Sequence, residues 1–490
     1  MNPGRVGTSV AAFMDGADQQ DNPDEQASVA PGTDGAPGTG DGPGTGNGPG
    51  TDGGPERTTV LVDVTNTVTV DFTSGLQRMV REVTSGLIGS LDHGLEIVPV
   101  TQPSEGQPLR RLTAEEQDHL AVHPPGGRAG RRADDFGMLS PLVRNVVELD
   151  LTARLRAGLA RRRRRRSPDA TPAALAVGNP APGSIFFDIE ASWQNPEPRT
   201  ELLPRLRSDG IHSAVMVADV LPELFPDWFD ARLRRLFRSW LLAHLRHSEL
   251  FLTISQCTAS DLAATATKLG VTRDLDIRVV PLGADFPVTT PRIVDLPAEI
   301  GPFLLVVGTL EPRKNQKLVL DAFDRLRVDH PDLGLVLVGR EGWMVGDLIG
   351  RIRRHPEFDR QLLWFGGIDD AQLAWLYQNA YLSICPSRYE GLGVPVMEAL
   401  HHGCPTICST RGALPEAGLG FTEDIDPDDL EGLVRLVGRH LDDPDYHQQA
   451  VVRTAGYPTP SWTETSRVVG DALRELARVP TVPPGAKDRA

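Results

Sequence analysis

The sequence predicts an α/β protein with two Rossmann-like, doubly wound domains. Short apolar runs of strand length alternate with longer stretches of helical periodicity along most of the chain. This alternation is typical of parallel sheets covered by helices on both faces. A proline-rich stretch without periodicity, at 286–302, interrupts it and is interpreted as a linker. We therefore expect one domain over 57–287 and a second over 298–460, with ligands bound in a cleft between the carboxyl ends of the two sheets.

The remaining segments have different compositions. Residues 1–56 repeat Gly, Pro, Thr and Asp, and they carry too little apolar surface to offset the chain entropy, so we expect a disordered tail. Residues from about 102 to 180 suggest an insertion or mobile segment, which contains the run Arg161 to Arg166. That run is either a solvated charged stretch or a site for anionic lipid or another polyanion. Residues 461–480 predict a final amphipathic helix that can cross back to the first domain.

The first domain is expected to open with a buried strand at Val60–Val64, a loop, and a helix within LQRMVREVTSGLIGSL. Strand, glycine-bearing loop and helix in that order is the usual start of a parallel α/β sheet. A second strand is expected at LEIVPVT, and further strands within GSIFFDIEASW, GIHSAVMVAD, ELFLTIS and IRVVPLG. Three of these strands end in polar or small residues, namely Asp219, Ser255 and Gly283.

The second domain repeats the pattern. Apolar strand-like runs are PFLLVVGTL, LGLVLVG, LLWFGG, YLSICPS and PTICS. Helical stretches such as QKLVLDAFDRLRVDH and DDAQLAWLYQNA lie between them. This predicts a second doubly wound sheet.

Composition excludes some classes of function. A formal net charge of −16 argues against a general nucleic-acid binder, which needs a basic face. The four cysteines form no C-x-x-C pair, which favours reduced thiols in a cytoplasmic protein. No apolar run approaches the roughly 18 residues that a membrane span requires, although peripheral contact with an anionic membrane stays open. No acidic motif in a suitable loop suggests a metal site.

The stretch VVGTLEPRKNQ predicts an anion site. An apolar strand ends at Gly308, a loop presents Arg313 and Lys314, and a helix is expected to begin near Asn315. The N-terminus of a helix offers unpaired N–H groups and a positive dipole end. Arginine adds a forked contact and lysine a point charge, which together suit a diphosphate. The alternative is a solvated loop with two exposed cations.

Two glutamates follow in PSRYEGLGVPVMEALHHGCPT. Glu390 lies in a glycine-rich bend, and Glu398 lies in the first turns of a helix expected to start near Val394 or Pro395. A carboxylate on such a helix can accept hydrogen bonds from a ribose diol. Glu390 can serve sugar hydroxyls or a developing positive charge. A surface loop followed by a surface helix is the alternative, and the two-carboxylate scheme of a glycosidase is a further competitor, although a glycosidase needs no cationic loop.

The whole string SRYEGLGVPVMEALHHGCPTI resembles the E-x7-E region of retaining glycosyltransferase family 4, which has the GT-B architecture. The similarity extends to GTLEPRKNQ, VGREGW, the Pro415–Glu416 pair and SWTET, and to VLVDVTNTVTVDFTSGLQRMVREV near the start of the first domain. It covers roughly 57–478 and is thinnest over 102–180.

The resemblance implies roles for individual residues of the second domain. Arg313 and Lys314 match the pair that neutralises the diphosphate of the donor, and Glu398 matches the glutamate that binds its ribose. Glu390 matches the glutamate near the transferred sugar. The residues implied to approach the donor through their backbone are Gly308, Gly391, Leu392 and Gly393.

In the first domain, Gly75 lies in the loop implied to close over the donor phosphates. Asp219 lies where the family shows an aromatic residue or histidine followed by aspartate. Here Ala218 precedes it, which removes the expected histidine.

By resemblance, the expected reaction is transfer of a sugar from a nucleotide sugar to a hydroxyl of a glycan or lipid-linked acceptor, with retained configuration and without a metal or other cofactor. Polysaccharide or glycoconjugate biosynthesis is the expected setting. A GT-B phosphorylase or epimerase is an alternative, and a non-catalytic scaffold or polyanion-binding protein is another.

Overall fold

The computed structural model describes residues 57–70, 74–89, 94–102, 104, 107–121, 175, 177–178, 180–285 and 290–481. The expectations for the tail 1–56 and for Arg161 to Arg166 lie outside these residues, as does most of the segment 102–180. In the described part, the expected fold class is confirmed, because two separate sheets with parallel cores are present.

The first sheet has seven strands in the order β3-β2-β1-β4-β5-β6-β7. All neighbouring pairs are parallel except β2 and β3. The strands are β1 (Thr58–Asp63), β2 (Leu95–Thr101), β3 (Arg110–Arg111), β4 (Ile185–Asp188), β5 (His212–Val217), β6 (Leu250–Thr253) and β7 (Asp276–Val279). The helices are α1 (Gly75–Gly89), α2 (Ala114–Ala121), α5 (Arg199–Ser208), α6 (Leu221–Leu224), α7 (Ala231–His247) and α8 (Gln256–Lys268), with 3-10 turns η4 (Ser192–Gln194) and η5 (Pro226–Trp228).

The second sheet has six strands in the order β10-β9-β8-β11-β12-β13, all paired in parallel. The strands are β8 (Phe303–Val307), β9 (Gly334–Val338), β10 (Leu362–Phe365), β11 (Leu382–Cys385), β12 (Thr406–Ser409) and β13 (Glu423–Ile425). The helical elements are η6 (Pro312–Lys314), α9 (Gln316–Leu326), α10 (Gly346–Arg353), α11 (Asp370–Asn379), α12 (Val394–His401), α13 (Leu414–Gly418), α14 (Leu430–Asp442), α15 (Pro444–Thr454) and α16 (Trp462–Leu476).

Alternating side chains of the strands build the layers on either face of each sheet. On β8, Leu304 packs with α9, α10 and α14, whereas its neighbours Phe303 and Leu305 pack with α11 and α12. On β1, Val60 and Val62 pack with α1 and α16. Because both faces are covered, the central strands are mainly apolar, as is typical of parallel sheets.

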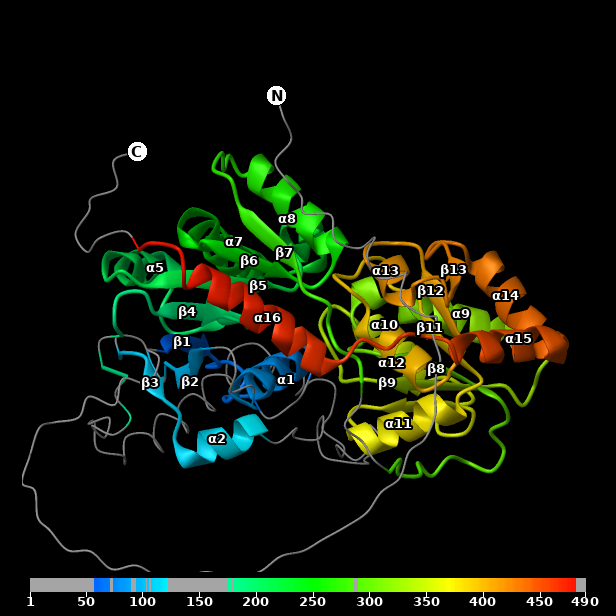
Figure 1. Cartoon of the computed structure of the whole chain (residues 1–490). Helices are drawn as coiled ribbons and strands as arrows, with labels where there is room; N and C mark the ends of the chain where they lie inside the picture. Colours follow the sequence, from blue (N-terminus) through cyan, green and yellow to red (C-terminus); the bar gives the residue numbers. More distant parts are fainter. Residues whose placement is uncertain are drawn as a thin grey trace, which may run out of the picture. The chain divides into compact units, whose positions relative to one another are not determined.

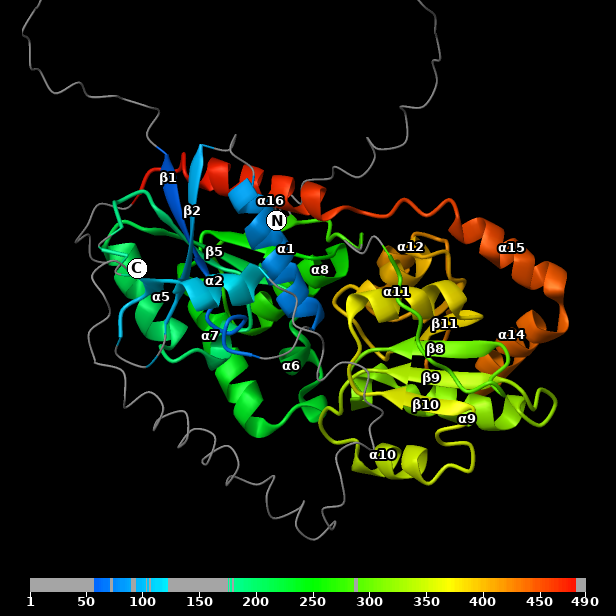
Figure 2. The same cartoon turned by 90° about the horizontal axis from the view of Figure 1, so that it is seen from below.

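The last helix, α16, packs along α1 on the first sheet, and Figures 1 and 2 both show the two helices side by side. The helices approach closely at Gly86, where an added Cβ would lie 2.1 Å from Ser466 Oγ. Further along, Thr465 Oγ1 donates to the Pro281 carbonyl at 2.7 Å and accepts from the Gly283 N–H at 2.8 Å. The C-terminal helix is therefore part of the first sheet's core, although it follows the second sheet in sequence.

The close approach of α1 and α16 at Gly86 predicts that a larger side chain there destabilises the fold. Gly86→Val should destabilise the protein by about 1–3 kcal/mol, because the new side chain overlaps a buried neighbour that cannot move freely. The measurement is the midpoint of thermal or denaturant unfolding. Gly89→Ala is the control, since a Cβ at Gly89 would have open space around it, and this variant should leave the midpoint nearly unchanged. Equal midpoints for wild type and Gly86→Val would contradict the packing.

Candidate functional site

The loop after β8 brings two cations to the carboxyl edge of the second sheet. β8 ends at Val307, and Gly308 adopts a φ of 142°, a conformation that favours glycine. The backbone then forms the 3-10 turn η6, which carries Arg313 and Lys314. An added Cβ at Gly308 would lie 3.4 Å from Lys314 Cε, so the lysine stem runs close over the glycine.

Asn315 fixes this turn to the next loop of the sheet. Its backbone is left-handed, with a φ of 54°, a conformation that asparagine tolerates better than most residues. Its side-chain amide donates to the Pro386 carbonyl at 3.2 Å and to the Pro427 carbonyl at 2.8 Å. The predicted cationic loop and the predicted glutamate bend are thus held together by one buried side chain.

The Glu390 carboxylate lies between the two cations. It pairs with the Arg313 guanidinium, and it lies 2.6 Å from Lys314 Nζ. Ser387 Oγ donates to it at 2.6 Å, and Glu390 is only 6% exposed. Burial alone would raise the pKa of Glu390, but Arg313, Lys314 and the hydrogen bonds outweigh burial and lower it to about 2. Glu390 is therefore an ionised hydrogen-bond acceptor at neutral pH.

Two further acids surround Arg313. The Glu311 carboxylate lies 2.7 Å from Arg313 Nε, and Asp219, just after β5, interacts electrostatically with the same guanidinium. Burial raises the pKa of Glu311 and of Asp219, while Arg313 opposes this in both. The pKa of Arg313 is raised although burial works against it, because Glu390 and Glu311 stabilise the cation.

Glu398 occupies a separate buried position on α12. It is 5% exposed and accepts a hydrogen bond of 3.0 Å from Tyr377 Oη on α11. Arg78 on α1 interacts with it electrostatically and also pairs with Asp370 at 2.5 Å. Burial raises the pKa of Glu398 to about 7, against the opposing effects of Arg78 and of Tyr377.

This elevated pKa gives a pH-dependent prediction. The pKa of Glu398 in the folded state lies above the usual value of 4.5, so its contribution to stability is present below pH 4.5 and is lost as the pH rises through 7. Between pH 5 and pH 8, the free energy of unfolding of wild type should fall by up to roughly 3 kcal/mol more than that of Glu398→Gln. Melting curves across that range test this, with Glu464→Gln as control, because the Glu464 side chain is only partly buried. Parallel curves for wild type and Glu398→Gln would contradict the shift.

The glycine bend leaves little room for side chains. A Cβ at Gly391 would lie 2.3 Å from the Ala218 carbonyl oxygen, and Gly393 has a φ of 111° and faces Leu414. The Leu392 side chain is buried in the hydrophobic core. Gly75, the remaining predicted residue, is the first residue of α1, and a Cβ there would have open space around it.

The structure thus brings Gly308, Arg313, Lys314, Glu390 and Asp219 into one cluster. Sequence reasoning did not select the partners that complete the site, which are Arg78, Glu311, Tyr377 and Ser387. For Arg78, a signal existed, because an arginine on the apolar face of an amphipathic helix needs a buried partner. Nothing in the sequence separates Tyr377 from other aromatic residues on predicted helices.

A second polar cluster is buried at the carboxyl end of the first sheet. Arg199 pairs with Asp63 and, at 2.6 Å, with Asp188, and His244 Nε2 lies 2.9 Å from the same Asp188 carboxylate. Burial alone would raise the pKa of Asp188, but Arg199 and His244 outweigh it and lower it. Burial also lowers the pKa of His244.

Glu190 extends this cluster to the loop after β1. Its carboxylate accepts from the backbone N–H groups of Asn66 and Thr67. Burial and the nearby Asp63 raise its pKa to about 8. This glutamate therefore shapes the turn that leads toward Gly75.

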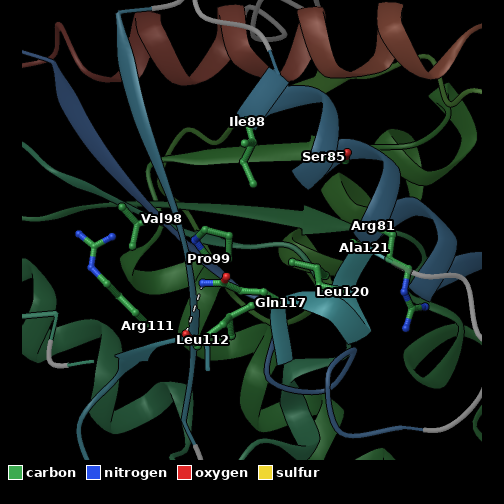
Figure 3. A pocket seen from close by; sticks show the side chains of 10 residues that line it. All are labelled: Arg81, Ser85, Ile88, Val98, Pro99, Arg111, Leu112, Gln117, Leu120 and Ala121. Carbon is green, nitrogen blue, oxygen red and sulfur yellow. Dashed lines mark hydrogen bonds between the residues drawn. The ribbon is translucent and has the colours of Figure 1, made fainter. Parts of the chain in front are cut away.

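A pocket of about 290 Å³ lies elsewhere in the first domain (Figure 3). It is formed by α1, β2, β3 and α2, and none of the predicted site residues lines it. The lining residues are Arg81, Ser85, Ile88, Val98, Pro99, Arg111, Leu112, Gln117, Leu120 and Ala121. We place the chemistry at the charged cluster, because acids and cations converge there, whereas the lining of this pocket has two arginines and no acid.

Residues 294–451 match the model of the family described as glycosyl transferases group 1. Sucrose-phosphate synthase from Thermosynechococcus elongatus shares the fold, with a TM-score of 0.54 and 17% identity over 86% of this chain and 99% of that one. The chain thus has the GT-B fold, and residues 294–451 match the glycosyl transferases group 1. The expected GT-B architecture is thereby confirmed, and the match over 294–451 supports the predicted resemblance to glycosyltransferases.

Among curated relatives, the serotype-specific mannosyltransferase WbdA of Escherichia coli is 26% identical over 71% of this chain and 37% of its own length. The O-antigen chain mannosyltransferase B of Escherichia coli is 31% identical over 31% of this chain and 40% of its own length. The chain thus spans well under half the length of these relatives.

Within the described residues, no helix is long and apolar enough to cross a bilayer, and no group of three or more His, Cys, Asp or Glu side chains is placed to hold a metal ion.

Proposed function

We propose that this glycosyltransferase moves a hexosyl group, mannose in the first instance, from a nucleotide sugar to a hydroxyl of a glycan or lipid-linked acceptor, with retained configuration and without a metal. The observation that carries the proposal is the paired Arg313 and Lys314 at the carboxyl edge of the second sheet, with Glu390 between them. The names of the E. coli relatives, both mannosyltransferases, support the choice of sugar.

In this proposal, Arg313 and Lys314 stabilise the negative charge that grows on the departing diphosphate. Preorganised cations in a buried site are worth more than in water, and they need no reorganisation during the reaction. Arg313 is already fixed by Glu311 and Asp219, so its fork is held in one orientation. The bond from the anomeric carbon to the diphosphate oxygen breaks, and a bond to the acceptor oxygen forms on the same face. The acceptor proton passes to the leaving diphosphate.

Glu390 would accept hydrogen bonds from the sugar or stabilise positive charge at the anomeric carbon. Its pKa of about 2 makes it unsuitable as a general acid at neutral pH. Glu398 would hold the ribose diol, with Tyr377 orienting its carboxylate. The backbone of Gly391, Leu392 and Gly393 would approach the sugar and phosphates, and Gly75 would approach them from the first domain. Asp219 would act by holding Arg313.

The deciding experiment is a panel of donors. Purified protein is incubated with GDP-mannose, UDP-glucose, ADP-glucose or dTDP-glucose and a mannan oligosaccharide, and release of nucleoside diphosphate is measured with and without EDTA. Acceptor-dependent release of GDP, insensitive to EDTA, is the expected result. Release that requires inorganic phosphate would favour a phosphorylase instead. Absence of release with all four donors would refute the proposed function.

Location in the cell is also a proposal. A cytoplasmic protein that contacts the anionic inner face of a membrane fits a lipid-linked acceptor. The contact would use Arg161 to Arg166, which lie outside the described residues, so its support comes from sequence alone.

A further inference from the structure

Helix α8 holds the residues on both sides of Glu390. Tyr389 Oη donates to the Asp261 carboxylate at 2.8 Å. The Gly391 carbonyl accepts two hydrogen bonds, one from Ser255 Oγ at 2.6 Å and one from Thr258 Oγ1 at 3.0 Å. The backbone that carries the Glu390 side chain is therefore fixed before and after it by one helix of the first domain.

The three contacting residues of α8 recur at intervals of three. Ser255, Thr258 and Asp261 thus lie along one face of the helix. Ser255 is also the N-cap, and its hydroxyl accepts from the Thr258 N–H at 2.9 Å. The Gly391 backbone also packs closely against the loop after β5, because a Cβ added at Gly391 would lie 2.3 Å from the Ala218 carbonyl oxygen.

A second connection joins α8 to the loop behind Glu390. The Glu416 carboxylate accepts from the N–H groups of Gln256 at 2.8 Å and Cys257 at 2.7 Å, the first turn of α8. A carboxylate is favoured there by the unpaired N–H groups and the helix dipole. Three residues before Glu416, the Ala413 N–H donates to the Glu390 carbonyl at 3.0 Å. The Glu390 backbone is therefore also connected, through the segment 413–416, to the first turn of α8.

We infer that Ser255, Thr258 and Asp261 are positioning residues, which set where the Glu390 carboxylate lies relative to Arg313 and Lys314. The inference rests on the proposed role of Glu390 in sugar transfer. A displacement of about 1 Å in a reacting group can cost on the order of a hundredfold in rate. Since the helix belongs to the first domain and Glu390 to the second, these contacts make the geometry of the donor site depend on how α8 is placed.

The test uses the double variant Thr258→Val and Tyr389→Phe, which removes the hydroxyl groups and keeps the side-chain shapes. Hydrogen exchange of the peptide 386–393 should become at least about tenfold faster, while exchange in α9 stays unchanged as an internal check of folding. With GDP-mannose, kcat should fall at least about tenfold, and the Kd for GDP should change less than about threefold. Thr258→Ser in place of Thr258→Val should recover most of the rate.

Ser260→Ala is the matched control, because Ser260 lies on the exposed side of α8 and donates only within the helix. Unchanged exchange in the double variant would overturn the inference. Faster exchange with wild-type kcat would also overturn it, because the contacts between α8 and the residues flanking Glu390 would then have no effect on catalysis. Absence of turnover by wild type with every donor would instead refute the proposed function, while the exchange measurement would still decide whether α8 holds the bend.

Discussion

Replacing Arg313 by alanine should lower kcat/KM by at least about 10²-fold, because loss of one preorganised charge partner from such a site typically costs 10²–10³ in rate. The loss should exceed that of Arg313→Lys, which keeps the charge but not the fork that contacts Glu311 and Glu390 at once. The measurement is the initial rate of GDP release from GDP-mannose over a range of donor concentrations.

Arg388→Ala provides the matched control for this prediction. Arg388 lies two residues before Glu390 in the same bend, but it is more exposed and pairs with Asp428. Exposed ion pairs contribute at most about 1 kcal/mol, so Arg388→Ala should retain most of the activity. If Arg313→Ala kept more than half of the wild-type rate, the assigned cation site would be wrong.

Replacing Glu390 by glutamine should lower kcat at least about 10²-fold and should also destabilise the protein by roughly 3–5 kcal/mol. Removing one partner of a buried ion pair leaves the opposite charge uncompensated, and here two cations, Arg313 and Lys314, lose the same carboxylate. An added diphosphate can supply the missing negative charge. GDP should therefore raise the melting temperature of Glu390→Gln by more than it raises that of wild type.

Glu423→Gln is the control that separates the loss of kcat in Glu390→Gln from its loss of stability. Glu423 also has a pKa lowered to about 2, because His440, Tyr446 and Arg453 outweigh its burial, and none of them belongs to the candidate site. This variant should lose stability without losing kcat and without a larger response to GDP. An equal response to GDP in all three proteins would show that the diphosphate does not bind at the Arg313 and Lys314 pair.

The central strands and the two sheets could be predicted because most of these strands are buried on both faces and read as apolar runs. Elements without that pattern were missed. β13 is only three residues long and has partly exposed acidic residues, and β3 consists of two arginines at an edge. Both lie where pairing to a neighbour, and not burial, defines the strand.

The candidate site was predictable in its ionic residues but not in their pairing. Arg313 and Glu390 are separated by 77 positions, and Arg78 and Asp370 by 292, so no local period indicates these contacts. Sequence reasoning placed Glu390 opposite a sugar and the cations opposite a diphosphate. It did not anticipate that the carboxylate itself neutralises both cations, which depends on the turn held by Asn315.

The tight backbone of the glycine bend has a consequence for protein engineering. Side chains cannot be introduced at Gly391, Gly393 or Gly412 without displacing Ala218, Leu414 or the Glu390 backbone. A library that randomises these three positions to alter donor choice should return mostly inactive clones. Ser387 and Tyr389 are poor targets as well, because the Ser387 hydroxyl donates to the Glu390 carboxylate and the Tyr389 hydroxyl donates to Asp261.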